Sequence, residues 1–149
     1  MTTYIQNKKA RHNFTLLEEF EAGVALYGHE VKAIRTGKGS LAGAHVVVRG
    51  GEAFLVGASI SPYQVPNTPT SYDPERPRKL LLSQKQLRKL ERESEQVGLT
   101  IVPIKWYNAG RFIKLAIALA RGKKKVDKRE ALKARATKRD IDRLLKNQL

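Results

Sequence analysis

Segments of apolar and β-forming residues, separated by turn residues, predict that most of the chain folds as β-strands. Six such segments cover residues 14–17, 20–26, 44–48, 53–60, 101–107 and 112–119. Gly50 and Gly51 lie between the third and the fourth segment, and paired glycines supply the positive φ that a tight hairpin turn requires. The last two segments predict a second hairpin with a longer turn. Gly23 indicates a bulge or a close approach of another part of the chain.

Two segments with helical spacing interrupt the predicted strands. The first covers residues 28–36 and stops at two glycines that favour a helix end. The second begins after Ser83, which is placed to cap it together with Gln86, and ends at Gly98. Its apolar stripe consists of Leu87, Leu90 and Val97. Residues 61–77 hold five of the six prolines and predict a long, stiff surface loop.

These elements predict a mainly β (α+β) fold. Six short strands and two small helices in about 120 residues favour a small antiparallel barrel of the oligonucleotide-binding type, with two or three flanking helices. The pattern alone leaves the topology open.

The charge of the chain is large and unevenly distributed. The 149 residues include 29 Lys+Arg and 14 Asp+Glu, for a formal net charge of +15. Residues 121–149 hold 12 of these cations and 4 of the acids, so about half of the excess charge lies in the last fifth of the chain. We therefore expect a body, residues 1–120, and a basic tail, residues 121–149, with different tasks. A polyanionic partner is indicated, RNA first and an anionic membrane as the main rival.

Several classes of protein are not supported. There is no apolar run of transmembrane length and no signal-like apolar segment near the N-terminus, so we expect a cytoplasmic protein. Cysteine is absent, which excludes disulfides, thiolate nucleophiles and cysteine metal sites. The three histidines are far apart, and neither a P-loop nor a nucleophile elbow is present. The sequence therefore predicts no enzyme, no cofactor and no metal site.

Cations of the body gather at three places, and each is a candidate RNA contact. The first group consists of Asn7, Lys8, Lys9, Arg11 and His12. The second consists of Lys32, Arg35 and Lys38. The third consists of Arg76, Arg78 and Lys79. The first group mixes cations with an amide and an imidazole, a set that can contact phosphates and also base edges or ribose hydroxyls. The third follows the proline-rich loop, whose stiffness lowers the entropic cost of ordering it on RNA.

Aromatic residues of the body offer rings on which unpaired bases can stack. They are Tyr63, Tyr72, Trp106 and Tyr107. We interpret Trp106 as a core or barrel-edge residue in preference to a stacking platform.

The tail has the pattern of a basic amphipathic helix. It starts with a run that includes Lys123, Lys124 and Lys125, and Asp127 then begins a capping-box spacing. Cations on one helical face are Lys128, Arg135, Arg139, Arg143 and Lys146. An isolated helix of this length is marginal in water, so we expect the tail to be disordered alone and to become helical on its partner.

An ordered set of short segments resembles the SsrA-binding (small protein B) family. They are Asn7–His12, Glu21–Gly23, Gly28–Lys32, Arg78–Leu82, Gly122–Lys124 and Asp127–Arg129. Each segment alone is weak evidence, but their common order and spacing, from about Ile5 to Asn147, are specific.

The resemblance implies a small β-barrel of the oligonucleotide-binding kind. It also implies that the protein is a monomer and that a membrane is not among its partners. It implies binding to the tRNA-like domain of transfer-messenger RNA and delivery of that RNA to stalled bacterial 70S ribosomes, the process called trans-translation. It also implies RNA-binding roles at the positions of Asn7, His12, Glu21 and Leu81.

The resemblance further implies that the tail contacts small-subunit rRNA near the decoding centre and becomes helical in the empty mRNA channel. The tail residues expected there are Asp127, Lys128, Arg129, Lys133, Arg135, Lys138, Arg139, Arg143 and Lys146. One departure is Thr137, a position at which many family members carry an aromatic residue or histidine. Residues 127–149 contain neither, so their cations and backbone must provide the contacts.

Two other functions fit parts of the pattern. A ribosomal or RNA-chaperone protein that binds rRNA constitutively would carry the same basic tail. A membrane-surface protein would use the tail as an interfacial helix, but its apolar face lacks the Trp and Phe that such helices favour.

Overall fold

The computed structural model describes residues 2–64 and 69–123. Its elements, in chain order, are β1 (Thr3–Gln6), α1 (Lys8–Asn13), β2 (Phe14–Val24), α2 (Gly28–Arg35), β3 (Gly39–Ser40), β4 (His45–Arg49), β5 (Glu52–Val56), β6 (Ser59–Ile60), β7 (Arg78–Leu81), α3 (Gln84–Ser94), β8 (Leu99–Ala109) and β9 (Phe112–Gly122). Within these residues, no helix has the length and apolar character needed to cross a bilayer.

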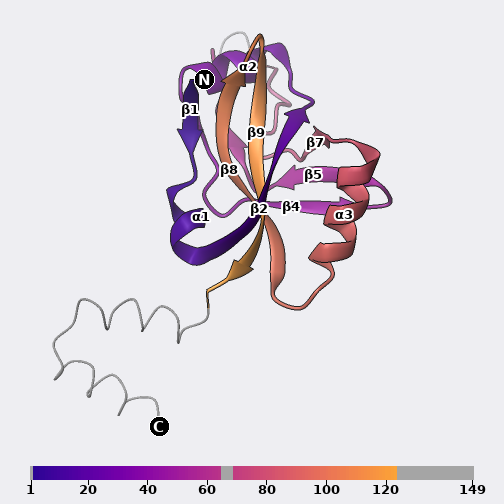
Figure 1. Ribbon diagram of the computed structural model, residues 1–149. Coiled ribbons are helices and arrows are strands. Elements are labelled where there is room, and N and C mark those ends of the chain that lie inside the picture. Colours follow the sequence, from indigo (N-terminus) through magenta and orange to yellow (C-terminus); the bar gives the residue numbers. More distant parts are fainter. Residues whose placement is uncertain (1, 65–68, 124–149) are drawn as a thin grey trace, which may run out of the picture.

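The strand pairings close into a ring. Seven antiparallel strands of the described chain follow the order β1-β8-β4-β5-β7-β2-β9, and β9 also pairs with β8 (Figure 1). A path from β8 through β4, β5, β7, β2 and β9 therefore returns to β8. The short strands β3 and β6 form a separate pair. The prediction of a mainly antiparallel β fold is confirmed.

The main core lies between the ring of strands and two helices. Ile34 of α2 and Leu90 of α3 are fully buried in the same apolar cluster as Trp106 of β8. The interpretation of Trp106 as a core residue is confirmed, and its ring is not available for stacking. In Figure 1, α2 lies above the strands and α3 lies to their right.

A second, smaller cluster lies on the outside of the ring, beneath α1. Ala10 of α1 packs there with Ala116, Ala118 and Ala120 of β9. The intervening residues, Ile113, Leu115, Ile117 and Leu119, face the main core. Because β9 alternates large inward side chains with small outward ones, α1 can lie close against its outer surface.

Several local predictions are confirmed. The helix α2 occupies the expected segment. At the start of α3, Ser83 Oγ accepts a hydrogen bond from the Gln86 amide and Gln86 Oε1 accepts one from the Ser83 amide, both at 3.2 Å. Gly50 and Gly51 take positive φ in the turn between β4 and β5. At Gly23, an added Cβ would lie 3.2 Å from the Leu81 Cβ, which is the predicted close approach.

Other local predictions are wrong. The expected strand 53–60 is two strands, because the chain turns at Gly57, where φ is +79°. The turn of the second hairpin is short, since Ala109 pairs with Phe112. Val97 is fully exposed and lies beyond the end of α3, so it has no place in the apolar stripe. Segments 14–17 and 20–26 are joined in the single strand β2, with an irregularity between Leu16 and Glu18.

Candidate nucleic-acid interface

The N-terminal group of candidates forms the start and the exposed side of α1. Lys8, Lys9, Arg11 and His12 are exposed. Asn7, in contrast, is buried, and its Nδ2 donates hydrogen bonds to the carbonyl oxygens of Leu41 (3.2 Å) and Pro103 (2.8 Å). The Asn7 amide group therefore fixes the position of α1, and the side chains that follow it meet the solvent.

The outer side of β2 lies beside α1 and carries two exposed carboxylates, Glu19 and Glu21. Arg11 Nη2 lies 3.8 Å from Glu19 Oε1. Tyr107 lies on β8, on the other side of β9 from β2, and its hydroxyl hydrogen-bonds to Glu21. Burial raises the pKa of Tyr107, and the charge and hydrogen bond of Glu21 raise it further, to about 12. Tyr107 thus remains protonated and orients the Glu21 carboxylate, and it is too buried to be the predicted stacking ring.

An exposed apolar patch continues this outer surface across β7, β2 and β9. We call it the outer patch; it consists of the exposed Leu81 and Phe112 and the partly buried Lys114, and Leu81 covers Gly23, which is buried. Leu81 is 56% and Phe112 is 69% exposed. Lys114 Nζ lies 5.9 Å from the centre of the Phe112 ring and 3.6 Å from where a Cβ at Gly23 would be. The patch offers an aromatic face and an aliphatic side chain next to a cation, a combination suited to an unpaired base.

Phe112 was missed by the sequence analysis. The sequence analysis placed it within the predicted strand 112–119 and assigned it no surface role, whereas in the structure Ile113 takes the inward position and Phe112 is exposed. The strict alternation of Ile113, Leu115, Ile117 and Leu119 is the signal that would have placed Phe112 on the surface.

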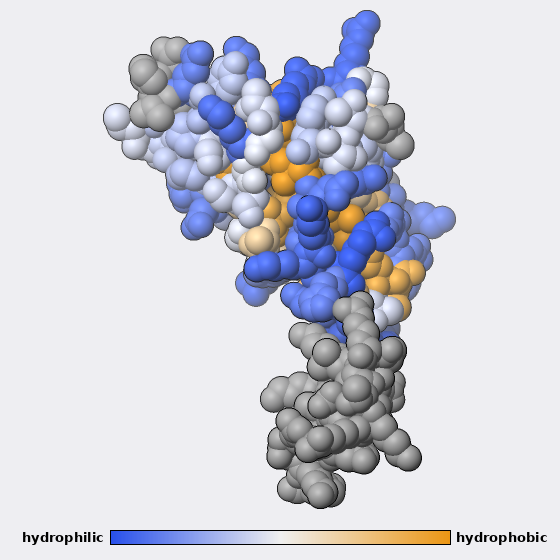
Figure 2. Space-filling model, turned by 90° about the vertical axis from the view of Figure 1, so that its left-hand side faces the viewer, coloured by the Kyte–Doolittle hydropathy of each residue, from blue (hydrophilic) through white to orange (hydrophobic). Residues whose placement is uncertain are grey.

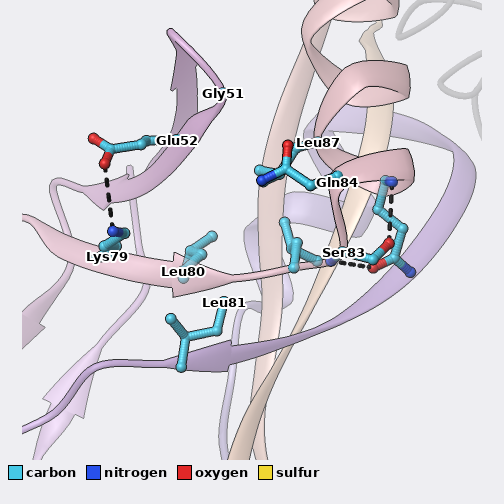
Figure 3. Close-up of a pocket in the computed structure, with 10 residues that line it drawn as sticks. Gly51, Glu52, Lys79, Leu80, Leu81, Ser83, Gln84 and Leu87 are labelled. Atoms are coloured by element: carbon cyan, nitrogen blue, oxygen red, sulfur yellow. Dashed lines mark hydrogen bonds and ion pairs between the residues drawn. The ribbon is translucent and has the colours of Figure 1, made fainter.

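A groove of about 540 Å³ lies next to Leu81, between the β4–β5 turn, β7 and the start of α3 (Figure 3). Leu80 and Leu81 point to opposite sides of β7, so only Leu81 extends the outer patch. Lys79 is exposed, and its Nζ lies 3.4 Å from Glu52 Oε1.

Figure 2 views the molecule from the side of β1 and α1. On this face, apolar atoms are surrounded by hydrophilic side chains.

The second predicted group lies apart from the first. Lys32 and Arg35 are exposed on α2, and Lys38 follows it. Lys38 Nζ donates to the Tyr63 carbonyl oxygen at 3.3 Å and lies 5.6 Å from the centre of the Tyr63 ring. Figure 1 shows α2 above the strands and α1 to their lower left, so the structure does not join these cations into one patch.

The third predicted group is mostly internal. Arg78 is fully buried, with Nη2 2.7 Å from Glu30 Oε2 and Nη1 2.9 Å from the Ala58 carbonyl oxygen. Arg76 also binds the Glu30 carboxylate and stacks on Tyr27, with its guanidinium carbon 4.0 Å from the ring centre. The expectation that Arg78 contacts RNA is wrong, because its guanidinium is buried and bonded within the protein. Arg76 is half-buried and already paired.

Tyr72 belongs to the same network. Its hydroxyl lies 3.0 Å from Glu30 Oε2 and 2.8 Å from the Ile60 carbonyl oxygen. Burial raises the pKa of Tyr72, and the hydrogen bond and charge of Glu30 contribute, to give about 12. This network joins α2 to the proline-rich loop and gives Tyr72 a structural role.

The start of the tail lies next to α1. The Lys123 amide donates to the Asn13 carbonyl oxygen at 3.0 Å, and its Nζ donates to the Arg11 carbonyl oxygen at 3.4 Å. The remaining predicted tail contacts lie outside the described residues. They are Lys124, Lys125, Asp127, Lys128, Arg129, Lys133, Arg135, Lys138, Arg139, Arg143 and Lys146.

Comparisons with known proteins agree on one family. The family model described as SmpB protein matches residues 4–147. An SsrA-binding protein of Microcystis aeruginosa is 49% identical over 140 residues, which cover 94% of this chain and 91% of that protein. One of Enterococcus hirae is 49% identical over 142 residues, which cover 95% of this chain and 92% of that protein.

A solved structure has a similar fold. It is described as "tmRNA-SmpB: a journey to the center of the bacterial ribosome", has 42% sequence identity and a TM-score of 0.69, and the match covers 86% of this chain and 93% of that one. Sequence and structure thus agree over most of the chain. The chain belongs to the SmpB protein family.

Proposed function

We propose that this protein binds transfer-messenger RNA at its tRNA-like domain and delivers it to stalled bacterial ribosomes, in the cytoplasm and as a binding factor without catalysis. The observation that carries the proposal is the membership in the SmpB protein family over nearly the whole chain. The structural match to a protein solved with transfer-messenger RNA supports the same partners.

The outer surface of the body supports a specific RNA contact in this proposal. Cations of α1 supply phosphate contacts, while the oriented carboxylate of Glu21 accepts a hydrogen bond from a base or a ribose hydroxyl. The outer patch adds stacking. Cations alone would bind any RNA, whereas Glu21 repels phosphates and is favourable only where a donor is placed opposite it.

The division of labour between body and tail is part of the proposal. Residues 1–120 recognise transfer-messenger RNA, and residues 121–149 enter the ribosome and probe the empty mRNA channel. The high positive charge of the tail supports a second polyanionic surface, because each phosphate contact releases counterions.

A competition experiment tests the proposal. Binding of the full chain to the isolated tRNA-like domain is measured across a salt series, against an equal-sized tRNA as competitor. We expect binding that survives excess tRNA at physiological salt. Equal affinity for both RNAs, falling steeply with salt, would contradict the proposal and favour a general rRNA-binding protein.

The outer patch gives a more local prediction. Phe112→Ala removes an exposed ring without opening the core, so folding stability is expected to change little. If Phe112 stacks on an unpaired base, affinity for the tRNA-like domain falls by about 1–3 kcal/mol. The matched control is Val97→Ala, which shortens another exposed apolar side chain, between α3 and β8 and outside the outer patch, and should leave affinity unchanged. Equal affinities of the two variants would remove Phe112 from the interface.

A further inference from the structure

Glu19 is an exposed carboxylate beside α1 that the proposed function does not use. On the outer side of β2 it lies opposite Ala118 of β9. Two residues further along β2, Glu21 lies opposite Ala116. Both alanines are buried in the small cluster beneath α1. Because alanine side chains are short, the two carboxylates rise from the sheet beside the helix without a bulky neighbour on β9. Glu19 therefore lies on the surface that the proposed function assigns to RNA.

The carboxylate of Glu19 holds the side chain of Arg11. Arg11 Nη2 lies 3.8 Å from Glu19 Oε1, and the two side chains are 67% and 55% exposed. An ion pair this exposed contributes little to folding stability. It does direct one of the three positive charges of α1 back onto the protein's own surface. A phosphate that approaches Arg11 must therefore displace Glu19 and then remain close to its negative charge.

The two carboxylates of β2 repel phosphates together. Residues two apart on a strand lie about 7 Å from each other on the same face. This spacing is shorter than the Debye length of about 8 Å at physiological salt, so a phosphate near one carboxylate is repelled by both. A ribose hydroxyl or a base amino group is attracted instead, because a carboxylate accepts hydrogen bonds at both oxygens. The outer side of β2 thus favours an RNA whose fold presents donors there and keeps its phosphates away.

We propose that Glu19 is a specificity-determining residue of the RNA surface. By holding Arg11 and repelling phosphates, it lowers the affinity for RNA in general. It lowers the affinity least for an RNA whose shape keeps phosphates away from β2. The preference of the body for the tRNA-like domain then depends on an acid as well as on the cations of α1. This inference rests on the proposed function for the identity of the preferred RNA.

Glu19→Gln in the full chain tests the inference, with the tRNA-like domain and an equal-sized tRNA as the two probes. The substitution keeps the size of the side chain, removes its charge and releases Arg11. At physiological salt we expect the affinity for tRNA to rise by about three- to tenfold. The slope of log affinity against log salt should steepen by about 0.7–0.9, because one more phosphate contact becomes available. Affinity for the tRNA-like domain should change far less, so the preference for it falls.

Two further variants separate this effect from a general change in charge. Glu95→Gln removes another exposed carboxylate, at the end of α3, and should leave the preference unchanged. Adding Arg11→Gln to Glu19→Gln should cancel the steeper slope, because the released guanidinium is then absent. The basic tail is the same in every variant, so differences between the variants report on the body.

A Glu19→Gln variant that keeps the wild-type preference, or whose slope for tRNA is unchanged, would overturn the inference. Equal gains in tRNA affinity for Glu19→Gln and Glu95→Gln would also overturn it, since net charge alone would then account for the effect. Failure of the proposed function would appear separately, as wild-type protein without preference for the tRNA-like domain.

Discussion

Glu30→Gln is expected to destabilise the folded protein by about 3–5 kcal/mol, because it leaves a buried guanidinium without its counter-charge. Arg78 is fully buried and two of its nitrogens bond to Glu30 Oε2, at 3.1 and 2.7 Å. The Tyr27 amide donates to Glu30 Oε1 at 2.8 Å, which ties the same carboxylate to the start of α2. Urea unfolding followed by circular dichroism measures the loss.

The control for this prediction is Glu52→Gln, which makes the same substitution in an exposed ion pair. Glu52 and Lys79 are both about half exposed, so the change should be below about 1 kcal/mol. Similar losses in the two variants would show that Glu30 is not the centre of the network.

The pH dependence of stability follows from the same carboxylate. Burial raises the pKa of Glu30, but the hydrogen bonds from Arg76, the Tyr27 amide and Arg78 lower it to about 2, from an ordinary value of 4.5. Between these values the unfolded chain binds more protons than the folded one. The contribution of Glu30 is therefore present above about pH 4.5 and is lost as the pH falls towards 2, and Glu30→Gln should lack this part of the acid sensitivity.

Deletion of residues 127–149 is expected to abolish peptide tagging on stalled ribosomes while leaving affinity for the tRNA-like domain nearly intact. The deleted segment holds 8 Lys+Arg and 4 Asp+Glu, but the outer patch, α1 and Glu21 all remain. Tagging is measured in a reconstituted translation system with a message that lacks a stop codon. Affinity is measured on the same preparations.

A full-length variant that keeps the tail but lacks its cations tests whether the tail acts through its charge. Its basic face is replaced by glutamine at Lys128, Arg135, Arg139, Arg143 and Lys146. If phosphate contacts carry the tail's role, this variant should also fail to tag. A deletion variant that still tags would contradict the proposed role of the tail, and a glutamine variant that tags normally would assign that role to its backbone or apolar face.

Much of the fold could be predicted because local chemistry specifies it. Gly50-Gly51 fixes a hairpin turn, and Ser83 with Gln86 fixes the start of α3. The strand β1 could not be found in this way, because its burial depends on pairing with β8, about 100 residues later in the chain. The topology could not be predicted for the same reason: the ring exists only through pairings between distant segments.

The candidate site shows the limit of reasoning from charge. Lys8 and Arg78 are both cations in basic segments, but Lys8 is exposed and Arg78 is buried against Glu30. The sequence does not reveal that Glu30 lies opposite Arg78, since 48 residues separate them. Resemblance to a family placed Leu81 at the site, and the structure adds Phe112 beside it through the neighbouring strands.

The pairing of β2 with β9 has a consequence for synthesis of the protein. Phe14 pairs with Gly122, so one edge of β2 has no partner until almost the whole body has been translated. At about 5–20 residues per second, that delay is roughly 5–20 s. During it, β2 is an extended, partly apolar segment open to aggregation, and Glu18, Glu19 and Glu21 within it supply the charges that discourage wrong partners. These acids of β2, among them Glu21 of the proposed RNA surface, thus protect the nascent chain before that surface exists.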